Sequence, residues 1–326
     1  MADNIIYARE ADWVSLLDKI REKSGKQEWM TLPQAIQTMS DIPDKIYKDI
    51  VTGNLGNVET ISLPDSILQS GTFYNMKNLK TVNLPNYTGG LVNSEWASYV
   101  FYNCESLNME KGLEKIKYIG PYTFALESPY VYKALEQKLE FNNLSSVYKC
   151  GFYNNVKIKE FKSLSVEAIW QEAFNYCKNM VGFYAPNLKN IYDKAFANTG
   201  LLSFCIEGKS ISIGDYVFEK SNIKTLKFKS PEIKMTIHSL KNSPLTSFWI
   251  GPGVKFIETG STPDNPDNKK LLFYNTTSIN SLKDIYVSNY GTGYLENVTT
   301  PTIHYNVSES DYNNIIKQIG GIVYWK

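Results

Sequence analysis

Apolar and polar residues alternate in short stretches that recur along most of the chain. Val82 and Leu84 alternate with Thr81 and Asn83. The same pattern returns in later stretches: Phe204 with Ile206, Leu226 with Phe228, and Phe248 with Ile250. Strict alternation over a few residues predicts a half-buried β-strand whose apolar side chains point inward.

A second pattern sets the period of these strands. Phe174, Phe196 and Phe218 are spaced 22 residues apart, and one further step reaches Leu240. Four phenylalanines upstream are spaced 28, 23 and 28 residues apart: Phe73, Phe101, Phe124 and Phe152. Loops inserted into the same repeat unit would produce these longer spacings. A unit of about 22 residues cannot bury an apolar face alone, but stacked units form a continuous core. The repeat predicts a solenoid whose units contain a short strand, a connecting turn, and a short irregular or helical turn that inserts the Phe.

The tripeptide Phe-Tyr-Asn recurs along the chain, at 73–75, 101–103, 152–154 and 273–275. We interpret it as a mark of the repeat, because its Phe is the packing residue, and not as a metal site or an aromatic cage. The four cysteines contain no CxxC pair and match neither a zinc pattern nor a disulfide scaffold. We expect them to be small, buried thiols.

Three segments carry a family resemblance: "TISLPDSILQSGTFYNMKNLKTVNLP" (60–85), "IWQEAFNYCKNMVGF" (169–183) and "SIGDYVFEKSNIKTLKF" (212–228). In period and in residue positions they resemble the BspA-like branch of the leucine-rich repeats. Cys104 and Cys177 each stand three residues after the Phe of their unit, where that family often has cysteine. The resemblance implies an α/β repeat solenoid in which residues 51–299 form a curved parallel sheet.

The two ends differ from the repeats. Residues 11–42 show helical spacing of apolar residues and predict a two-helix module, so 1–50 is expected to be a helical N-terminal cap or attachment module. This segment resembles one in tail and baseplate-associated proteins of phages and prophages of low-GC Gram-positive bacteria. Residues 300–326 are expected to form a small α/β C-terminal cap, with a helix after Ser308 and a last strand at 322–325.

Charge and motifs exclude several classes of function. With 34 Lys+Arg against 33 Asp+Glu, the chain has no general field to attract nucleic acid or a membrane surface. No secretory signal and no apolar run long enough to span a bilayer is visible, so we expect no membrane insertion. His238 and His304 lack catalytic surroundings, and residues 264–269 lack the glycine and glutamate of a calcium loop. We therefore expect no enzyme activity, no cofactor and no metal.

The outward strand positions offer the best candidate binding surface. They line up along one face of the predicted sheet, as binding surfaces of solenoids do. Trp249, Tyr286 and Tyr184 are large amphipathic side chains on this face, and Lys227 belongs to the same set. These four are our candidate binding residues; alternatively, a cap, a loop or another subunit covers them.

Three functions remain open at this point. The first is a non-enzymatic phage virion protein of the tail or baseplate, attached to other virion proteins by its N-terminal helices and binding a host surface protein or glycan. The second is a bacterial BspA-like cell-surface adhesin, and the third is a polysaccharide-degrading tail protein. The sequence contains no coiled-coil heptads and leaves a homo-oligomer open.

Overall fold

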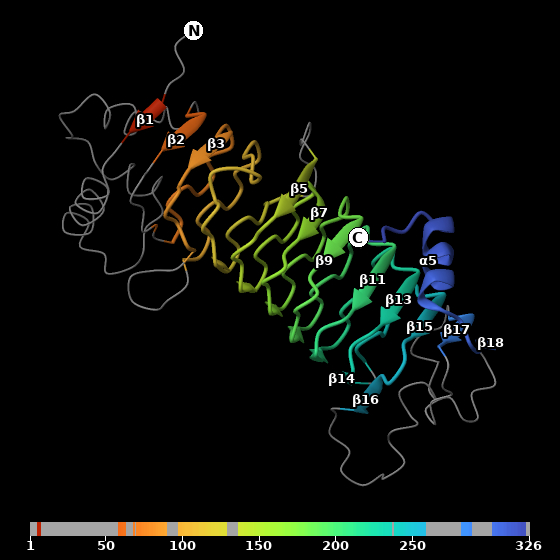
Figure 1. The fold of residues 1–326 in the computed structure, drawn as a ribbon. Helices are drawn as coiled ribbons and strands as arrows, with labels where there is room; N and C mark the ends of the chain where they lie inside the picture. The colour runs from red at the N-terminus through yellow and green to blue at the C-terminus, as the bar shows by residue number, and fades with distance from the viewer. Residues whose placement is uncertain are drawn as a thin grey trace, which may run out of the picture.

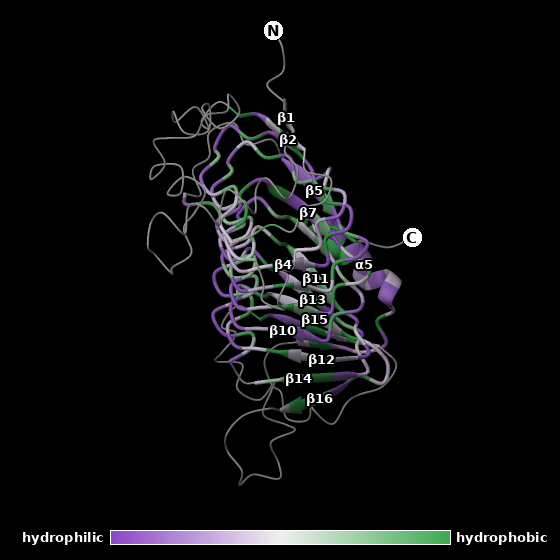
Figure 2. Cartoon of the chain, turned by 90° about the vertical axis from the view of Figure 1, so that its left-hand side faces the viewer, coloured by the Kyte–Doolittle hydropathy of each residue, from purple (hydrophilic) through white to green (hydrophobic). Residues whose placement is uncertain are grey.

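The chain folds as a parallel β-solenoid of about eight turns. The computed structural model describes residues 5–7, 58–62, 68, 70–89, 97–128, 136–236, 238–258, 282–288 and 302–323. Successive coils stack along one axis, and all described strand pairs are parallel (Figures 1 and 2). The predicted solenoid with a parallel sheet is therefore confirmed.

The strands form two faces of the solenoid. The front face carries β1 (Ile5–Tyr7), β2 (Thr60–Ser62), β3 (Thr81–Asn83), β5 (Gln137–Glu140), β7 (Ile158–Lys162), β9 (Gly182–Tyr184), β11 (Ser203–Ile206), β13 (Thr225–Phe228), β15 (Ser247–Ile250), β17 (Asp284–Val287) and β18 (Thr302–His304). The back face carries β4 (Tyr118–Ile119), β6 (Ser146–Val147), β8 (Ala168–Ile169), β10 (Asn190–Ile191), β12 (Ser210–Ile213), β14 (Glu232–Met235) and β16 (Lys255–Glu258). One α-helix, α5 (Glu309–Gln318), lies within the described residues.

From β5 to β16 each coil contains two strands, where the sequence predicted one. In the coil that starts at β11, the chain crosses to β12 on the back face and returns to β13 through the Phe turn. Ile213 lies in β12 with its side chain buried. Several back-face strands have only two residues, which is too short for alternation to be visible in the sequence.

The turn that inserts the Phe is irregular and not helical. In most coils its backbone visits the left-handed region twice, for example at Tyr216 (φ 56°) and Lys220 (φ 53°). In the Phe-Tyr-Asn units the asparagine takes this conformation: Asn75, Asn103 and Asn154 have φ of 62°, 59° and 59°. Asparagine is among the non-glycine residues that tolerate positive φ best, so the tripeptide combines a core Phe with a turn-forming Asn.

The repeated phenylalanines form a continuous column in the core. Ring centroids of consecutive members from Phe73 to Phe218 are 5.1–5.8 Å apart, with nearly parallel planes. Leu240 is buried in the next coil, as predicted. The thiols of Cys104 and Cys177 are buried beside the column and donate to the carbonyl oxygens of Phe73 and Phe152. The packing role predicted for the Phe and these two Cys is therefore confirmed.

One coil departs from the pattern, next to the insertion in residues 125–138. Residues 107–112 run beside β3 without forming a strand, and buried side chains bond to their backbone instead. Gln137 donates to the carbonyl of Leu107 (2.8 Å) and accepts from the amide of Met109 (2.8 Å). The ammonium of Lys157, whose side chain is also buried, donates to the same Leu107 carbonyl.

Both ends differ from our expectations. At the N-terminus, β1 pairs in parallel with β2, so part of residues 1–50 extends the sheet, while the helices predicted in 11–42 lie outside the described residues. At the C-terminus, α5 lies across the front face and does not cover the end of the stack (Figure 1). Residues 322–323 form no strand. The expectation of helical caps is thus not supported, because the C-terminal helix packs on a sheet face; the domain boundaries at 50 and 299 stay predictions.

Candidate functional site

Outward side chains of the front face form two rows that run along the solenoid. The first row contains Glu140, Lys162 and Tyr184 and, on the sheet that begins with β11, Cys205, Lys227, Trp249, Tyr286 and His304. The second row contains Lys138, Glu160 and Gly182, followed by Ser203, Thr225, Ser247, Asp284 and Thr302. The register places our four candidate residues in the first row.

Helix α5 covers the half of this face that starts at β11. The ammonium of Lys227 donates to Glu309 Oε1 (2.7 Å) and to Asn313 Oδ1 (2.9 Å). Glu309 also pairs with Lys229, at 3.1 Å. The helix begins at Glu309, with Ser308 as its N-cap, and turns Tyr312 and Ile316 toward the sheet. Its acidic N-terminal turn therefore lies on the two lysines.

Two of the four candidate residues are consequently buried. Lys227 is 0% exposed and Trp249 2% exposed, and the Trp249 indole donates to the Val307 carbonyl (2.8 Å). Tyr286 is half-buried between His304 and Tyr312, with ring centroids 4.6 and 5.2 Å away. Sequence reasoning placed these side chains outward and left open that a cap covers them, but it did not predict that the C-terminal helix docks here. Lys227 and Trp249 therefore cannot act as exposed contact residues while α5 is docked, which corrects their assignment as binding residues.

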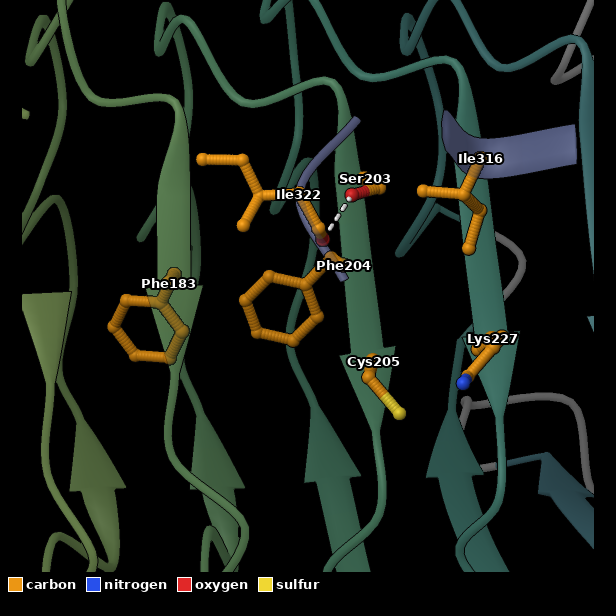
Figure 3. Close-up of a pocket in the computed structure, with 7 residues that line it drawn as sticks. All are labelled: Phe183, Ser203, Phe204, Cys205, Lys227, Ile316 and Ile322. Carbon is orange, nitrogen blue, oxygen red and sulfur yellow. Dashed lines mark hydrogen bonds between the residues drawn. The ribbon is translucent and has the colours of Figure 1, made fainter. Parts of the chain in front are cut away.

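The tail after α5 closes the covered area on the side of β9. Ser203 Oγ donates to the Ile322 carbonyl (3.0 Å), and Ile322 lies near the rings of Phe183 and Phe204 (Figure 3). The space left between tail and sheet, also lined by Cys205, holds no more than about one water molecule. This cavity is a packing gap and not a ligand pocket.

Strands β5, β7 and β9 form a part of the face that α5 does not cover, and we call its charged and tyrosine side chains the open strip: Lys138, Glu140, Glu160, Lys162 and Tyr184. Lys138 pairs with Glu160 (2.6 Å) and Lys162 with Glu140 (2.8 Å), each across neighbouring strands. Tyr184 is half-buried at its end, and burial raises the pKa of its hydroxyl. The open strip therefore presents paired charges and a neutral hydroxyl on a rigid sheet.

The histidines occupy structural positions. His304 Nε2 lies 2.9 Å from Asp284 Oδ1, and within the described ranges no hydroxyl or thiol bonds to its ring. His238 stacks on Tyr216, with parallel rings 5.9 Å apart. Among the residues that the structure describes, no group of three His, Cys, Asp or Glu side chains is placed to hold a metal ion. The loop at 264–269 lies outside the described residues.

The ion pairs of Glu309 predict that docking of α5 depends on pH. Burial raises the pKa of the Glu309 carboxyl, but hydrogen bonds from Lys227 and Lys229 outweigh burial, so its pKa is lowered from 4.5. Asn313 accepts from the same Lys227 ammonium, Glu207 pairs with the same Lys229, and Cys205 lies close enough to interact with the Glu309 charge. Because the pKa of this carboxyl is lower in the docked state than in the unfolded chain, its ion pairs stabilise docking at any pH above the unfolded-state pKa. This stabilisation is lost as the pH falls through the pKa of the docked state.

We therefore expect α5 to stay docked above the ordinary carboxyl pKa of 4.5 and to loosen as the pH falls below it. The measurement is the ¹⁹F resonance of Trp249 in protein labelled with fluorotryptophan, assigned with the Trp249→Phe variant. Glu309→Gln is the control, because it removes the titrating group and should remove the acid-dependent shift. A resonance that moves identically in both proteins would contradict the assignment.

The stacked coils define this protein as a leucine-rich-repeat solenoid. Comparison with known protein families identifies which branch of these repeats it contains. The chain belongs to the family of the BspA type leucine rich repeat region, six copies of which match residues 44–162 and 145–264. No curated protein matches the chain in sequence. No helix in the described residues combines the length and apolarity needed to cross a membrane.

Two solved structures are similar over most of the chain. A leucine-rich cell surface protein from Faecalibacterium prausnitzii is 15% identical to this chain, with a TM-score of 0.31. The aligned region covers 78% of this chain and 81% of that protein. A leucine-rich repeat protein from Bacteroides ovatus is 14% identical, with 76% and 84% coverage and a TM-score of 0.34. At this level of similarity, they support no statement about function.

Proposed function

We propose that this chain is a non-enzymatic binding protein of a bacterial cell surface and that the open strip contacts a protein or glycan. The observation that carries the proposal is the row of Lys162, Tyr184 and their neighbours, which is presented on aligned strands and is not covered by α5. Solenoids bind through such extended faces because every repeat adds one more strand to a rigid surface.

Membership of the BspA-type repeat family supports the cell-surface proposal over a virion protein. The virion hypothesis depends on residues 11–42, which lie outside the described residues, and no match to a tail or baseplate protein accompanies it. The hypothesis of a polysaccharide-degrading enzyme finds no supporting site among the described residues, since the paired carboxylates of the open strip are bonded to lysines.

The location can be tested on intact bacteria that express the protein. Antibodies against the solenoid should label cells that have not been permeabilised, and brief protease treatment of intact cells should remove the signal. Detection only after lysis would contradict a cell-surface location, and detection in purified phage particles would restore the virion hypothesis.

Binding can be tested with the double variant Lys162→Ala/Tyr184→Ala. We expect it to lose at least about 10-fold in affinity for a ligand found by screening glycan and extracellular-protein arrays, because a few central residues carry most of the binding energy. The matched control is Lys189→Ala, since Lys189 forms a similar ion pair with Glu167 (2.7 Å) outside the front face. Equal affinity of a folded double variant and the control would exclude the open strip.

A further inference from the structure

The contacts of α5 form an apolar cluster that is separate from the solenoid core. The cluster contains Trp249, Tyr312 and Ile316, against which Tyr286, Val307, Ile315 and Val323 pack. The main core lies on the other side of the sheet, where Phe248 and Ile250 of the same strand point inward. Because the backbone of the strands separates the two clusters, the main core stays packed whether or not α5 is present.

The surface beneath α5 is composed like one that faces water. Ser203, Thr225, Lys227 and Ser247 alternate along the strands with fully apolar inward residues. Hydroxyl and ammonium groups are costly to bury without partners, but they hydrogen-bond to water when a cover leaves. An uncovered front face therefore leaves no buried polar group unsatisfied, and only Trp249 and its apolar neighbours lose their packing.

Helix α5 is also short. It spans ten residues, Glu309–Gln318, and isolated helices below about 12–15 residues are marginal in water. Its helical state thus depends on docking, and release returns the segment to a flexible chain with higher entropy.

We propose that α5 is a removable cover, and that the surface beneath it binds an amphipathic helix of a partner protein that carries an acidic residue one turn before an aromatic one. The pattern is the one that α5 itself uses. Glu309 pairs with Lys227 and Lys229, and the Tyr312 hydroxyl lies 3.2 Å from Ser247 Oγ, beside Trp249.

Ile316 completes the pattern one turn after Tyr312, so positions i, i+3 and i+7 lie on one helix face, as in other helix-in-groove complexes. This inference goes beyond the proposed function, which concerns the open strip. Either can fail while the other holds, because they concern different strands and different ligands.

Hydrogen exchange of the full chain tests the removable cover. Amides of α5 should exchange faster than those of β13 and β15. Glu309→Gln should accelerate the exchange of the α5 amides by about 10–100-fold while the strands stay protected, since it removes the carboxylate that pairs with the buried Lys227. The matched control is Asp311→Asn, which removes the same charge from the same helical turn but touches Ser308 and not the sheet. It should change the α5 rates less than about 3-fold.

Thiol labelling gives a second measurement that helix fraying alone does not change. Cys205 lies beside the tail, and burial raises the pKa of its thiol, whereas Cys177 lies in the main core. Glu309→Gln should speed labelling of Cys205 about 10-fold or more and leave Cys177 unchanged. Labelling of both cysteines at one common rate in every variant would show that α5 leaves only on global unfolding and would overturn the removable cover.

The partner is tested with a fluorescent peptide of residues 305–323 added to the Glu309→Gln chain. We expect saturable binding that unlabelled peptide displaces, and about 10-fold weaker binding of a peptide in which Glu309 is replaced by glutamine. A Glu309→Gln chain that shows the faster α5 exchange and Cys205 labelling, yet binds neither peptide at millimolar concentration, would overturn the helix-binding surface. Equal binding of both peptides would overturn the requirement for the acidic residue.

Discussion

Replacing Phe196 with alanine is expected to lower the free energy of unfolding by about 3–5 kcal/mol. Phe196 lies between Phe174 and Phe218 in the column, with centroid distances of 5.4 and 5.8 Å. It also meets Phe183 and Phe204, which point inward from the front face, at 4.7 and 5.1 Å. Four rings from its own coil and the two neighbouring coils surround it, so the cavity left by alanine cannot close.

The conservative control is Phe196→Leu, because Leu240 already fills the equivalent position in a later coil. We expect it to cost about 1–1.5 kcal/mol, since leucine refills most of the volume. Both values come from denaturant unfolding followed by circular dichroism. Exchange of the neighbouring amides should show the same order, because each coil depends on its neighbours. A loss below about 1 kcal/mol for Phe196→Ala would contradict a tightly packed column.

The sequence was sufficient to predict the solenoid because its signal is periodic. A repeated Phe every 22 residues and alternation at Leu226 and Phe228 fall on buried positions of successive coils. The left-handed turn was not predicted, because Tyr216, Lys220 and Asn242 share a backbone conformation but no side-chain chemistry. Such a conformation is enforced by hydrogen bonds to the next coil, for example from Lys220 N to Asn242 O.

The candidate site was predictable only in part, for a related reason. Alternation along each strand was enough to place Lys227 and Trp249 on the outward side. Their burial depends on Glu309, which is 82 residues from Lys227, and on a helix whose local sequence does not encode where it docks. A lysine at an outward position is ordinarily solvated; only a long-range contact makes it part of an interface.

Lys157 is buried although lysine is ordinarily solvent-exposed. The second prediction concerns the effect of this burial on stability. The Lys157 side chain is 2% exposed, and its ammonium reaches the Leu107 carbonyl inside the irregular coil. Burial lowers its pKa from 10.5 to about 8, although Cys104 and Glu105 act in the opposite direction. The charged amine is thus held where water is scarce, in the coil that lacks a front-face strand.

The consequence is a stability that rises with pH. Below about pH 8 both folded and unfolded chains carry the charge, and the folded chain bears the cost of burying it. Between about 8 and 10.5 the unfolded chain binds more protons than the folded one, so stability increases with pH. At about 1.4 kcal/mol per pKa unit, the whole interval corresponds to about 3 kcal/mol.

We therefore expect Lys157→Met to be more stable than the native chain by about 1–3 kcal/mol at pH 7, since Leu107 keeps the hydrogen bond from Gln137. The gain should shrink as the pH rises from 8 to 10. Subtracting the two unfolding free energies at each pH cancels the titration of the tyrosines, which both proteins share.

Lys159→Met is the matched control: Lys159 lies on β7, immediately after the first residue of that strand, and pairs with Glu136 in an exposed position. Exposed pairs contribute about 0–1 kcal/mol, so this variant should differ little from the native chain and show no trend above pH 8. A Lys157→Met protein that is less stable at pH 7, with a difference that does not change with pH, would mean that Lys157 is hydrated in solution. The irregular coil would then open to water beside the insertion, and the polar side chains of Gln137 and Lys157 would be lining a wet gap in place of the missing strand.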